Sequence, residues 1–213
     1  MPKLKKVTAL LILGAGSMAV EVLDIAEAGG RFEVLGFAVD RPGGPTEVEG
    51  RPVYRFPDLP PGIACVAGIV SNRRRAFIEA VVALGHPFVS IVHPSAQVSR
   101  RAAISPGCVV HPGAVIASNT VIGAHCLVNR GALIGHDNRI EDYTTIGPGA
   151  NLAGGLSIGP GAFLGVGCVI RDHLTIGAGA VVAAGAVVVQ PVAPHTMVGG
   201  SPAQLIKTGV DGL

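Results

Sequence analysis

The sequence predicts two structural classes in one chain: a small α/β domain over residues 1–90 and an all-β parallel β-helix over residues 91–200, with a C-terminal tail over residues 201–213. Three observations lead to this prediction. An aliphatic residue returns at every sixth position from Val98 to Val188 without a break. The 31 glycines and the aromatic content of only 4% require a core of small and branched side chains, as in repetitive folds. The first 90 residues instead alternate strand-like and helix-like segments.

The N-terminal segments follow the order strand, turn, helix. Residues 7–13 (VTALLIL) are an apolar run typical of a buried strand, and the glycine-rich residues 14–17 predict a tight turn. Residues 18–28 then predict a helix that ends at Gly29-Gly30. Two further strands and a second helix are expected at residues 34–39, 63–70 and 73–84 respectively. This order predicts a small parallel α/β domain.

The turn after the first predicted strand carries a loose dinucleotide-binding pattern, which makes the domain Rossmann-like. The pattern is Gly14-Ala15-Gly16-Ser17-Met18-Ala19, with Asp40 at the end of the second predicted strand. Because a helix N-terminus binds phosphate whatever the nucleotide is, we expect Gly14, Gly16, Ser17 and Met18 near a diphosphate. Asp40 is expected near the ribose or the base.

The six-residue period of the second segment cannot be reconciled with a helical period of 3.6 or with an ordinary strand meander. Sixteen consecutive positions follow it: Val98, Ile104, Val110, Ile116, Ile122, Val128, Ile134, Ile140, Ile146, Leu152, Ile158, Leu164, Ile170, Ile176, Val182 and Val188. The residue four positions later is usually small, as at Ala102, Cys108, Ala114, Thr120, Cys126, Ala132, Thr144, Ala150, Ala162, Cys168, Ala180 and Ala186. Each hexad therefore predicts one short strand and a turn, with two inward positions.

Three hexads make one triangular coil of 18 residues, so sixteen hexads make a little over five coils. Residues 18 positions apart are expected to stack, about 4.8 Å from each other along the axis. This spacing tells which side chains neighbour each other on successive coils.

Charge and hydropathy exclude two classes of partner. The net charge is +2, from 16 basic and 14 acidic residues, and Arg73 to Arg75 form the only dense basic run, so no nucleic acid is expected. No apolar run reaches the 18 residues that a membrane helix needs. The basic start and the apolar residues 7–13 are interpreted as the approach to a first strand, not as a signal peptide, because they lead directly into the glycine turn.

The cysteines suggest a reduced, cytoplasmic setting. Cys65, Cys108, Cys126 and Cys168 show no CxxC spacing and no cluster with histidine. We interpret them as small core residues.

Several hexads resemble those of the left-handed β-helix acyltransferases, namely Ile146 to Ala150, Ile158 to Ala162 and Ile176 to Ala180. Together with the glycine-rich βα unit, the segments IVHPSA (91–96), GHD (135–137) and GSPA (200–203) resemble the NeuD/PglD-type sugar acyltransferases over nearly the whole chain. The resemblance implies a left-handed coil, acetyl-CoA as the acyl donor, and a small-molecule sugar as the acceptor, often a nucleotide-linked amino sugar. It also implies a homotrimer with active sites between neighbouring subunits.

By this resemblance His136 is the catalytic base, because acyl transfer to an amine needs a group that takes a proton near neutral pH. Asp137 would orient the imidazole. Adjacent residues on a regular strand point to opposite faces, so this contact requires a corner between the two. If Asp137 is instead a solvated turn residue, Asp172, two coils from His136, is the alternative acid.

The same resemblance supplies the remaining site residues. The amide of Gly154, one coil from His136, would bind the thioester carbonyl, and Thr145, Val166 and Ala184 would line the CoA channel. Ser71, Asn72 and Arg75 resemble the family's polar turn beside the nucleotide. The chain departs from the family at Thr145, where many relatives carry histidine, at Val70, where they tend to have glycine, and at Gln204, where a basic residue is common.

Two alternatives to a CoA-dependent enzyme follow from the same residues. Zinc is not expected, because His111, His125, His136 and His173 contain no HxxxxH pair of the kind that β-helical carbonic anhydrases use. A non-catalytic β-helix that binds a nucleotide through its N-terminal domain is the second alternative, and the pair His136-Asp137 speaks against it.

Overall fold

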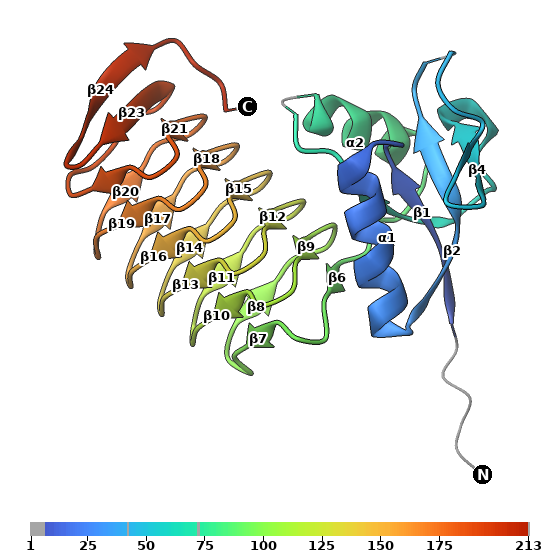
Figure 1. The fold of residues 1–213 in the computed structure, drawn as a ribbon, viewed down its shortest axis with the longest axis horizontal. Helices are drawn as coiled ribbons and strands as arrows, with labels where there is room; N and C mark the ends of the chain where they lie inside the picture. The colour runs from blue at the N-terminus through green and yellow to red at the C-terminus, as the bar shows by residue number, and fades with distance from the viewer. Residues whose placement is uncertain (1–6, 42, 72, 213) are drawn as a thin grey trace. The chain divides into compact units, whose positions relative to one another are not determined.

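The computed structural model describes residues 7–41, 43–71 and 73–212. These residues form two compact units, one ending at Pro94 and the other beginning at Ser95. Figure 1 labels most of their elements, and each unit is described by itself below.

The N-terminal unit is a small α/β sheet domain. Its strands are β1 (Thr8–Leu13), β2 (Phe32–Val39), β3 (Glu47–Val48), β4 (Arg51–Arg55), β5 (Ala64–Ala67) and β6 (Ile91–Val92), and its helices are α1 (Ser17–Gly29), α2 (Arg74–Ala83) and the short 3₁₀ helix η1 (Phe56–Asp58). The sheet has the order β3-β4-β2-β1-β5. Parallel pairing joins β1 to β2 and β5, and β2 to β4, so the carboxyl ends of these strands share one edge.

The expected βα unit is confirmed, with two differences farther along the unit. The third predicted strand, residues 63–70, is shorter than expected: β5 starts at Ala64 and ends at Ala67. The short antiparallel pair of β3 and β4 was not predicted. Its sequence, with Pro52 and charged residues around a two-residue turn, lacks the apolar run that identified the other strands.

The C-terminal unit is a parallel β-helix with three sheets, whose strands from β7 to β22 are two residues long (Figure 1). The first sheet contains β7 (Gln97–Val98), β10 (Val115–Ile116), β13 (Leu133–Ile134), β16 (Asn151–Leu152), β19 (Val169–Ile170) and β22 (Val187–Val188). The second contains β8 (Ala103–Ile104), β11 (Val121–Ile122), β14 (Arg139–Ile140), β17 (Ser157–Ile158) and β20 (Thr175–Ile176). The third runs through β9 (Val109–Val110), β12 (Leu127–Val128), β15 (Thr145–Ile146), β18 (Phe163–Leu164), β21 (Val181–Val182), β23 (Thr196–Gly200) and β24 (Ala203–Thr208).

The predicted 18-residue stacking is confirmed in all three sheets. Ile116 pairs in register with Ile134, Ile122 with Ile140, and Val128 with Ile146. The last coil is two residues shorter, because β21 pairs with β23 through Val182 and Val198. The segment expected as a tail belongs to this unit: β24 pairs with β23 in antiparallel fashion.

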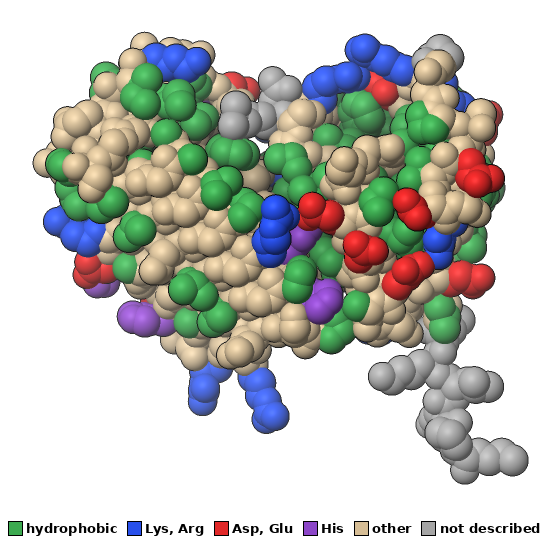
Figure 2. All heavy atoms as spheres, in the orientation of Figure 1, with side chains coloured by type: hydrophobic (Ala, Val, Ile, Leu, Met, Phe, Trp, Pro, Cys, Tyr) green, Lys and Arg blue, Asp and Glu red, His purple; other side chains and the backbone are tan. Residues whose placement is uncertain are grey.

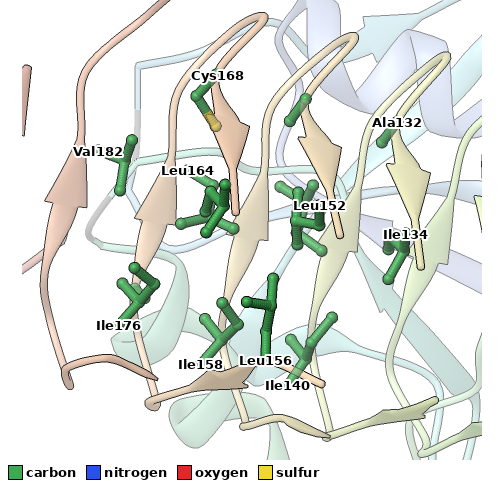
Figure 3. Packing of buried hydrophobic residues seen from close by; sticks show 14 of the residues in the cluster. Ala132, Ile134, Ile140, Leu152, Leu156, Ile158, Leu164, Cys168, Ile176 and Val182 are labelled. Carbon is green, nitrogen blue, oxygen red and sulfur yellow. The ribbon is translucent and has the colours of Figure 1, made fainter. Parts of the chain in front are cut away.

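The core of the β-helix is the predicted aliphatic ladder. From Val110 to Val188 every residue of the six-residue register is at most 2% exposed. Figure 3 shows these side chains stacked inside successive coils, with Ala132 and Cys168 at the second inward position. At that position Leu156 and Leu174 replace the usual small residue, and Asn138 brings a buried polar group into the core beside the site described below.

Three further features lie outside the aliphatic ladder: the surface, the cysteines and the length of the helices. Figure 2 shows mostly backbone and uncharged polar or glycine residues, with scattered hydrophobic side chains, on the displayed surface of the coils, and acidic side chains gathered over the N-terminal unit. All four cysteines are free and buried, and burial raises the pKa of the Cys65 and Cys168 thiols to about 12. None of the helices in the described ranges has the length and apolarity that crossing a membrane requires.

Candidate active site

The predicted histidine and its acid meet at the corner that follows β13. Asp137 has a φ of +57°, in the left-handed region, which turns the chain sharply between the two side chains. The Nδ1 atom of His136 consequently lies 2.7 Å from Oδ2 of Asp137. The corner that adjacent residues need for such a contact is therefore present. The other acid considered, Asp172, lies 3.8 Å from His173 instead.

This contact determines which nitrogen of His136 can act as a base. A carboxylate only accepts hydrogen bonds, so Nδ1 carries the hydrogen that it donates to Asp137. The lone pair of the neutral ring is then on Nε2. Because the imidazole side chain is 66% exposed, Nε2 can be reached by a ligand.

A third side chain, which the sequence reasoning missed, completes the arrangement. Asn119 lies one coil before Asp137, also in the left-handed region with a φ of +62°, and its Nδ2 donates to Oδ1 of Asp137 at 3.0 Å. The hydrogen bonds from Asn119 and from His136 hold the pKa of the Asp137 carboxyl below its usual value. The 18-residue spacing between Asn119 and Asp137 is the signal that points to this contact.

The backbone of the corner is held by two buried polar side chains. The carbonyl oxygen of Gly135 accepts hydrogen bonds from Oγ1 of Thr120 at 2.7 Å and from Nδ2 of Asn138 at 2.9 Å. Asn138 also donates to the carbonyl oxygen of Ala153 and accepts from the amide of Leu156. Its amide group thus ties the His136 corner to the next coil, which explains a polar residue at an inward position.

Gly154 lies against the imidazole ring, as the 18-residue spacing predicts. A Cβ atom on Gly154 would lie 2.7 Å from Cε1 and 2.8 Å from Nε2 of His136, so only glycine leaves the ring its place. In the described part of the chain the Gly154 amide donates to no protein acceptor, whereas the next amide, of Gly155, donates to the carbonyl oxygen of His136 at 2.9 Å. A backbone donor is thus present beside the base.

The three residues expected along a CoA channel differ in exposure. Val166 is 55% exposed, and Ala184 is exposed at the same corner one coil later. The amide of Gly185 donates to the carbonyl oxygen of Val166 at 2.8 Å, which connects these two corners. Thr145 is only 4% exposed on β15, so Val166 and Ala184 are the two that a ligand can reach in the single chain.

A separate cavity of about 430 Å³ lies at the carboxyl edge of the N-terminal sheet. Most residues expected to bind a nucleotide line it: Gly14, Gly16, Ser17, Met18, Asp40 and Ser71. Gly14 has a φ of +105°, and a Cβ atom there would lie 2.9 Å from the carbonyl oxygen of Gly68, so the turn requires glycine. The N-terminus of α1 opens at this cavity, where its first amides have no partner within the helix.

The cation that lines this cavity is Arg73 instead of the expected Arg75. Arg73 donates to Oδ2 of Asp40 at 2.9 Å, and its guanidinium lies 5.1 Å from the ring centre of Phe77. Arg75 is not among the lining residues and pairs with Glu79 at 2.8 Å, one helical turn on. Asn72 lies outside the described residues. The first residue of α2 decides which arginine faces the cavity. The sequence predicted a helix from residue 73, whereas α2 begins at Arg74 and Arg73 precedes it.

No group of three or more His, Cys, Asp or Glu side chains able to hold a metal ion is found across residues 7–41, 43–71 and 73–212. The chemical groups brought together on the β-helix are an imidazole, its carboxylate partner and a backbone amide. Such a set can accept a proton from a nucleophile and donate a hydrogen bond to a developing oxyanion.

Comparison with known proteins finds solved structures that are similar to this chain. Neither a protein-family model nor a curated protein matches the chain. The chain is similar to perosamine N-acetyltransferase from Caulobacter crescentus, solved as a histidine-to-asparagine variant with CoA and GDP-perosamine: identity is 30%, 93% of this chain and 97% of that chain are covered, and the TM-score is 0.85.

Two further solved structures agree. The acetyltransferase domain of PglB from Neisseria gonorrhoeae, in complex with acetyl coenzyme A, has 30% identity and a TM-score of 0.86, covering 94% of this chain and all (100%) of that one. WeeI from Acinetobacter baumannii AYE has 27% identity and a TM-score of 0.84, covering 93% of this chain and 100% of that one. Similarity thus extends over both units of the chain.

Proposed function

Because the chain belongs to the hexapeptide-repeat sugar acetyltransferases, we propose that it transfers the acetyl group of acetyl-CoA to an amine, or to a hydroxyl, of a nucleotide-linked sugar, with His136 as the general base. The observation that carries the assignment of the base is the His136–Asp137 contact of 2.7 Å beside Gly154. The chain's neighbours in structure include enzymes bound to CoA or acetyl coenzyme A, which supports acetyl-CoA as the co-substrate.

Each group of the corner has a defined part in the proposed reaction. The acceptor nitrogen attacks the thioester carbonyl carbon and gives its proton to Nε2 of His136. The negative charge that develops on the carbonyl oxygen is stabilised by the Gly154 amide. When the tetrahedral intermediate collapses, the C–S bond breaks, the proton on His136 passes to the departing sulfur, and CoA leaves as a thiol. Asp137 keeps the imidazole in the required tautomer throughout.

The donor and the acceptor are proposed to bind at different places. Val166 and Ala184, exposed at the corners of successive coils, are proposed to line the CoA channel. Thr145 is buried on β15, which pairs with β18, the strand that precedes Val166. The acceptor's nucleotide is proposed to bind in the cavity of the N-terminal unit, whose volume of about 430 Å³ is in the range of small-molecule sites. The perosamine N-acetyltransferase complex with GDP-perosamine supports a nucleotide-linked amino sugar as the acceptor class.

A homotrimer is proposed as the active assembly, with sites between neighbouring β-helices. Outward apolar side chains support an interface between coils: Leu133 is 43% exposed and Val169 41% exposed in the same sheet. A cytoplasmic location is also proposed, and the four free, buried cysteines support it.

The function is tested by a thiol-release assay. Acetyl-CoA is offered with UDP-, GDP-, dTDP- and CMP-linked amino sugars, the CoA thiol is measured with a thiol reagent, and the product is identified by mass spectrometry. The protein's own thiols do not disturb the assay near pH 8, because all four cysteines are buried and the pKa values of Cys65 and Cys168 are about 12. Thiol release and an acetylated sugar with one nucleotide class are expected. Nucleotide binding without release for any class would favour the non-catalytic scaffold.

Substitution of the two arginines tests where the acceptor's nucleotide binds. Arg73→Ala is expected to raise the KM for the nucleotide sugar by about tenfold, the effect of losing one charge-assisted hydrogen bond, with the KM for acetyl-CoA unchanged. Arg75→Ala is the matched control, since Arg75 pairs with Glu79 away from the cavity, and should leave both constants within about twofold of wild type. A larger effect at Arg75 would instead favour the expectation from sequence. Steady-state kinetics with each substrate varied in turn gives the KM for the nucleotide sugar and the KM for acetyl-CoA in both variants.

A further inference from the structure

We propose that Asn119 is a positioning residue of the active site, which holds the Asp137 carboxylate in the orientation that His136 needs. The inference rests on the proposed function, because it assumes that His136 is the base. Asn119 acts at one remove: its Nδ2 donates to Oδ1 of Asp137 at 3.0 Å, while Oδ2 of the same carboxylate contacts Nδ1 of His136 at 2.7 Å. Within residues 7–41, 43–71 and 73–212, each of the two carboxylate oxygens therefore has one side-chain partner.

The backbone places Asn119 for this contact. The amide of Asp137 donates to the carbonyl oxygen of Ser118 at 3.0 Å, so the two corners are joined directly beside the side-chain contact. Both Asn119 and Asp137 have left-handed backbone conformations, with φ values of +62° and +57°. Asparagine tolerates that conformation better than most residues, and unlike aspartate or glycine it can also donate a hydrogen bond from its side chain.

The contact matters because Asp137 is not held by burial. Its side chain is 56% exposed, so without a second partner the carboxylate could rotate and exchange His136 for water. The imidazole would then lose the acceptor that keeps the hydrogen on Nδ1 and the lone pair on Nε2. Asn119 is also the largest contributor to the lowered pKa of the Asp137 carboxyl, which agrees with a hydrogen bond to its ionised form.

A role in folding alone does not account for this residue. Asn119 is exposed, and the backbone hydrogen bond between Ser118 and Asp137 does not involve its side chain. The buried side chains that hold the corner in place are Thr120 and Asn138, through the carbonyl oxygen of Gly135. Removing the Asn119 amide should therefore change the chemistry more than the stability.

The test is a double-mutant cycle on kcat. Asn119→Gly keeps the left-handed backbone and removes the amide, while Asn119→Asp keeps the size and replaces the donor by a charge that repels Asp137. Each variant is expected to lower kcat by about 3- to 10-fold, as for one exposed hydrogen bond to a charged group, with both KM values within about twofold and the melting temperature unchanged. In an Asp137→Ala background, Asn119→Gly should not change kcat further, because the carboxylate through which Asn119 acts on His136 is absent.

Several outcomes overturn the inference while the base assignment stands. The first is an unchanged kcat in Asn119→Gly when His136→Ala is inactive. The second is an equal loss of kcat from Asn119→Gly with and without the Asp137 side chain. The third is a loss of kcat in Asn119→Gly while Asn119→Asp has the wild-type kcat. The last would mean that only the stiffness of the turn matters. Retained turnover in His136→Ala is a different result, which removes the proposed base and the role of Asn119 with it.

Discussion

At the scale of single residues, the site depends on one contact between sequence neighbours and on contacts between residues that are 18 positions apart and meet on successive coils. His136 contacts its sequence neighbour Asp137 only because the backbone turns there, and it lies against Gly154 because one full coil separates them. The glycine leaves space for the ring and exposes an amide at the same time. One residue thus serves both the position of the base and the proposed oxyanion contact.

Gly154→Ala tests this close approach. The added Cβ atom would lie 2.7 Å from the imidazole, which can move because it is the exposed end of a side chain, so we expect kcat to fall by about 10- to 100-fold with little change in melting temperature. Gly159→Ala is the control with the opposite signature. Its Cβ atom would lie 2.5 Å from the backbone nitrogen of Ala178, which cannot move, so the melting temperature should fall. Equal melting temperatures and equal kcat values for the two variants would contradict this account.

Sequence reasoning reached some residues of the site and not others, for physical reasons. His136 and Asp137 could be named because the segment GHD (135–137) resembles that of the family, and Gly154 could be placed beside His136 because 18 residues, one coil, separate the two. Asn119 obeys the same spacing, but its role depends on a left-handed corner that the period does not reveal. Arg73 could not be separated from Arg75, because the facing of a helix depends on its first residue, which composition leaves open by one or two positions.

At the scale of elements, the strands of the β-helix are too short to be stable by themselves. Each strand from β7 to β22 contributes two residues, of which one points inward and contacts the next coil. Stability therefore comes from the continuous aliphatic ladder and not from any single strand. The ladder could be predicted in full because it is periodic, whereas β3 and β4, which have no such pattern, could not.

Ile146→Ala tests the ladder. Ile146 is fully buried, at 0% exposure, and its strand pairs in register with Val128 and Leu164 on the adjacent coils. Loss of its side chain should lower the free energy of unfolding by about 2–5 kcal/mol, measured by denaturant titration. Ile206→Ala deletes the same atoms where they are 56% exposed on β24 and should cost less than about 1 kcal/mol. Equal costs would mean that the ladder is not the core.

At the scale of the whole molecule, the chain has a cavity proposed to bind a nucleotide in one unit and a corner proposed to carry out acyl transfer in the other. The proposed trimer should bury the outward apolar side chains of the coils. Leu133→Glu places a charge where a 43% exposed leucine would enter that interface, so we expect a lower sedimentation coefficient than that of wild type and loss of activity. Wild-type protein that sediments as a stable, active monomer would contradict the shared site.

The central claim is that His136 is the base of an acetyltransferase. The most direct test is kcat of His136→Ala with acetyl-CoA and the nucleotide sugar identified by the thiol-release assay, at a pH where wild type is fully active. General-base catalysis is worth about 10²- to 10⁴-fold, so we predict a loss of that size, with the oligomeric state and the affinity for acetyl-CoA retained. Turnover within about threefold of wild type would contradict the claim, whatever the fold of the chain.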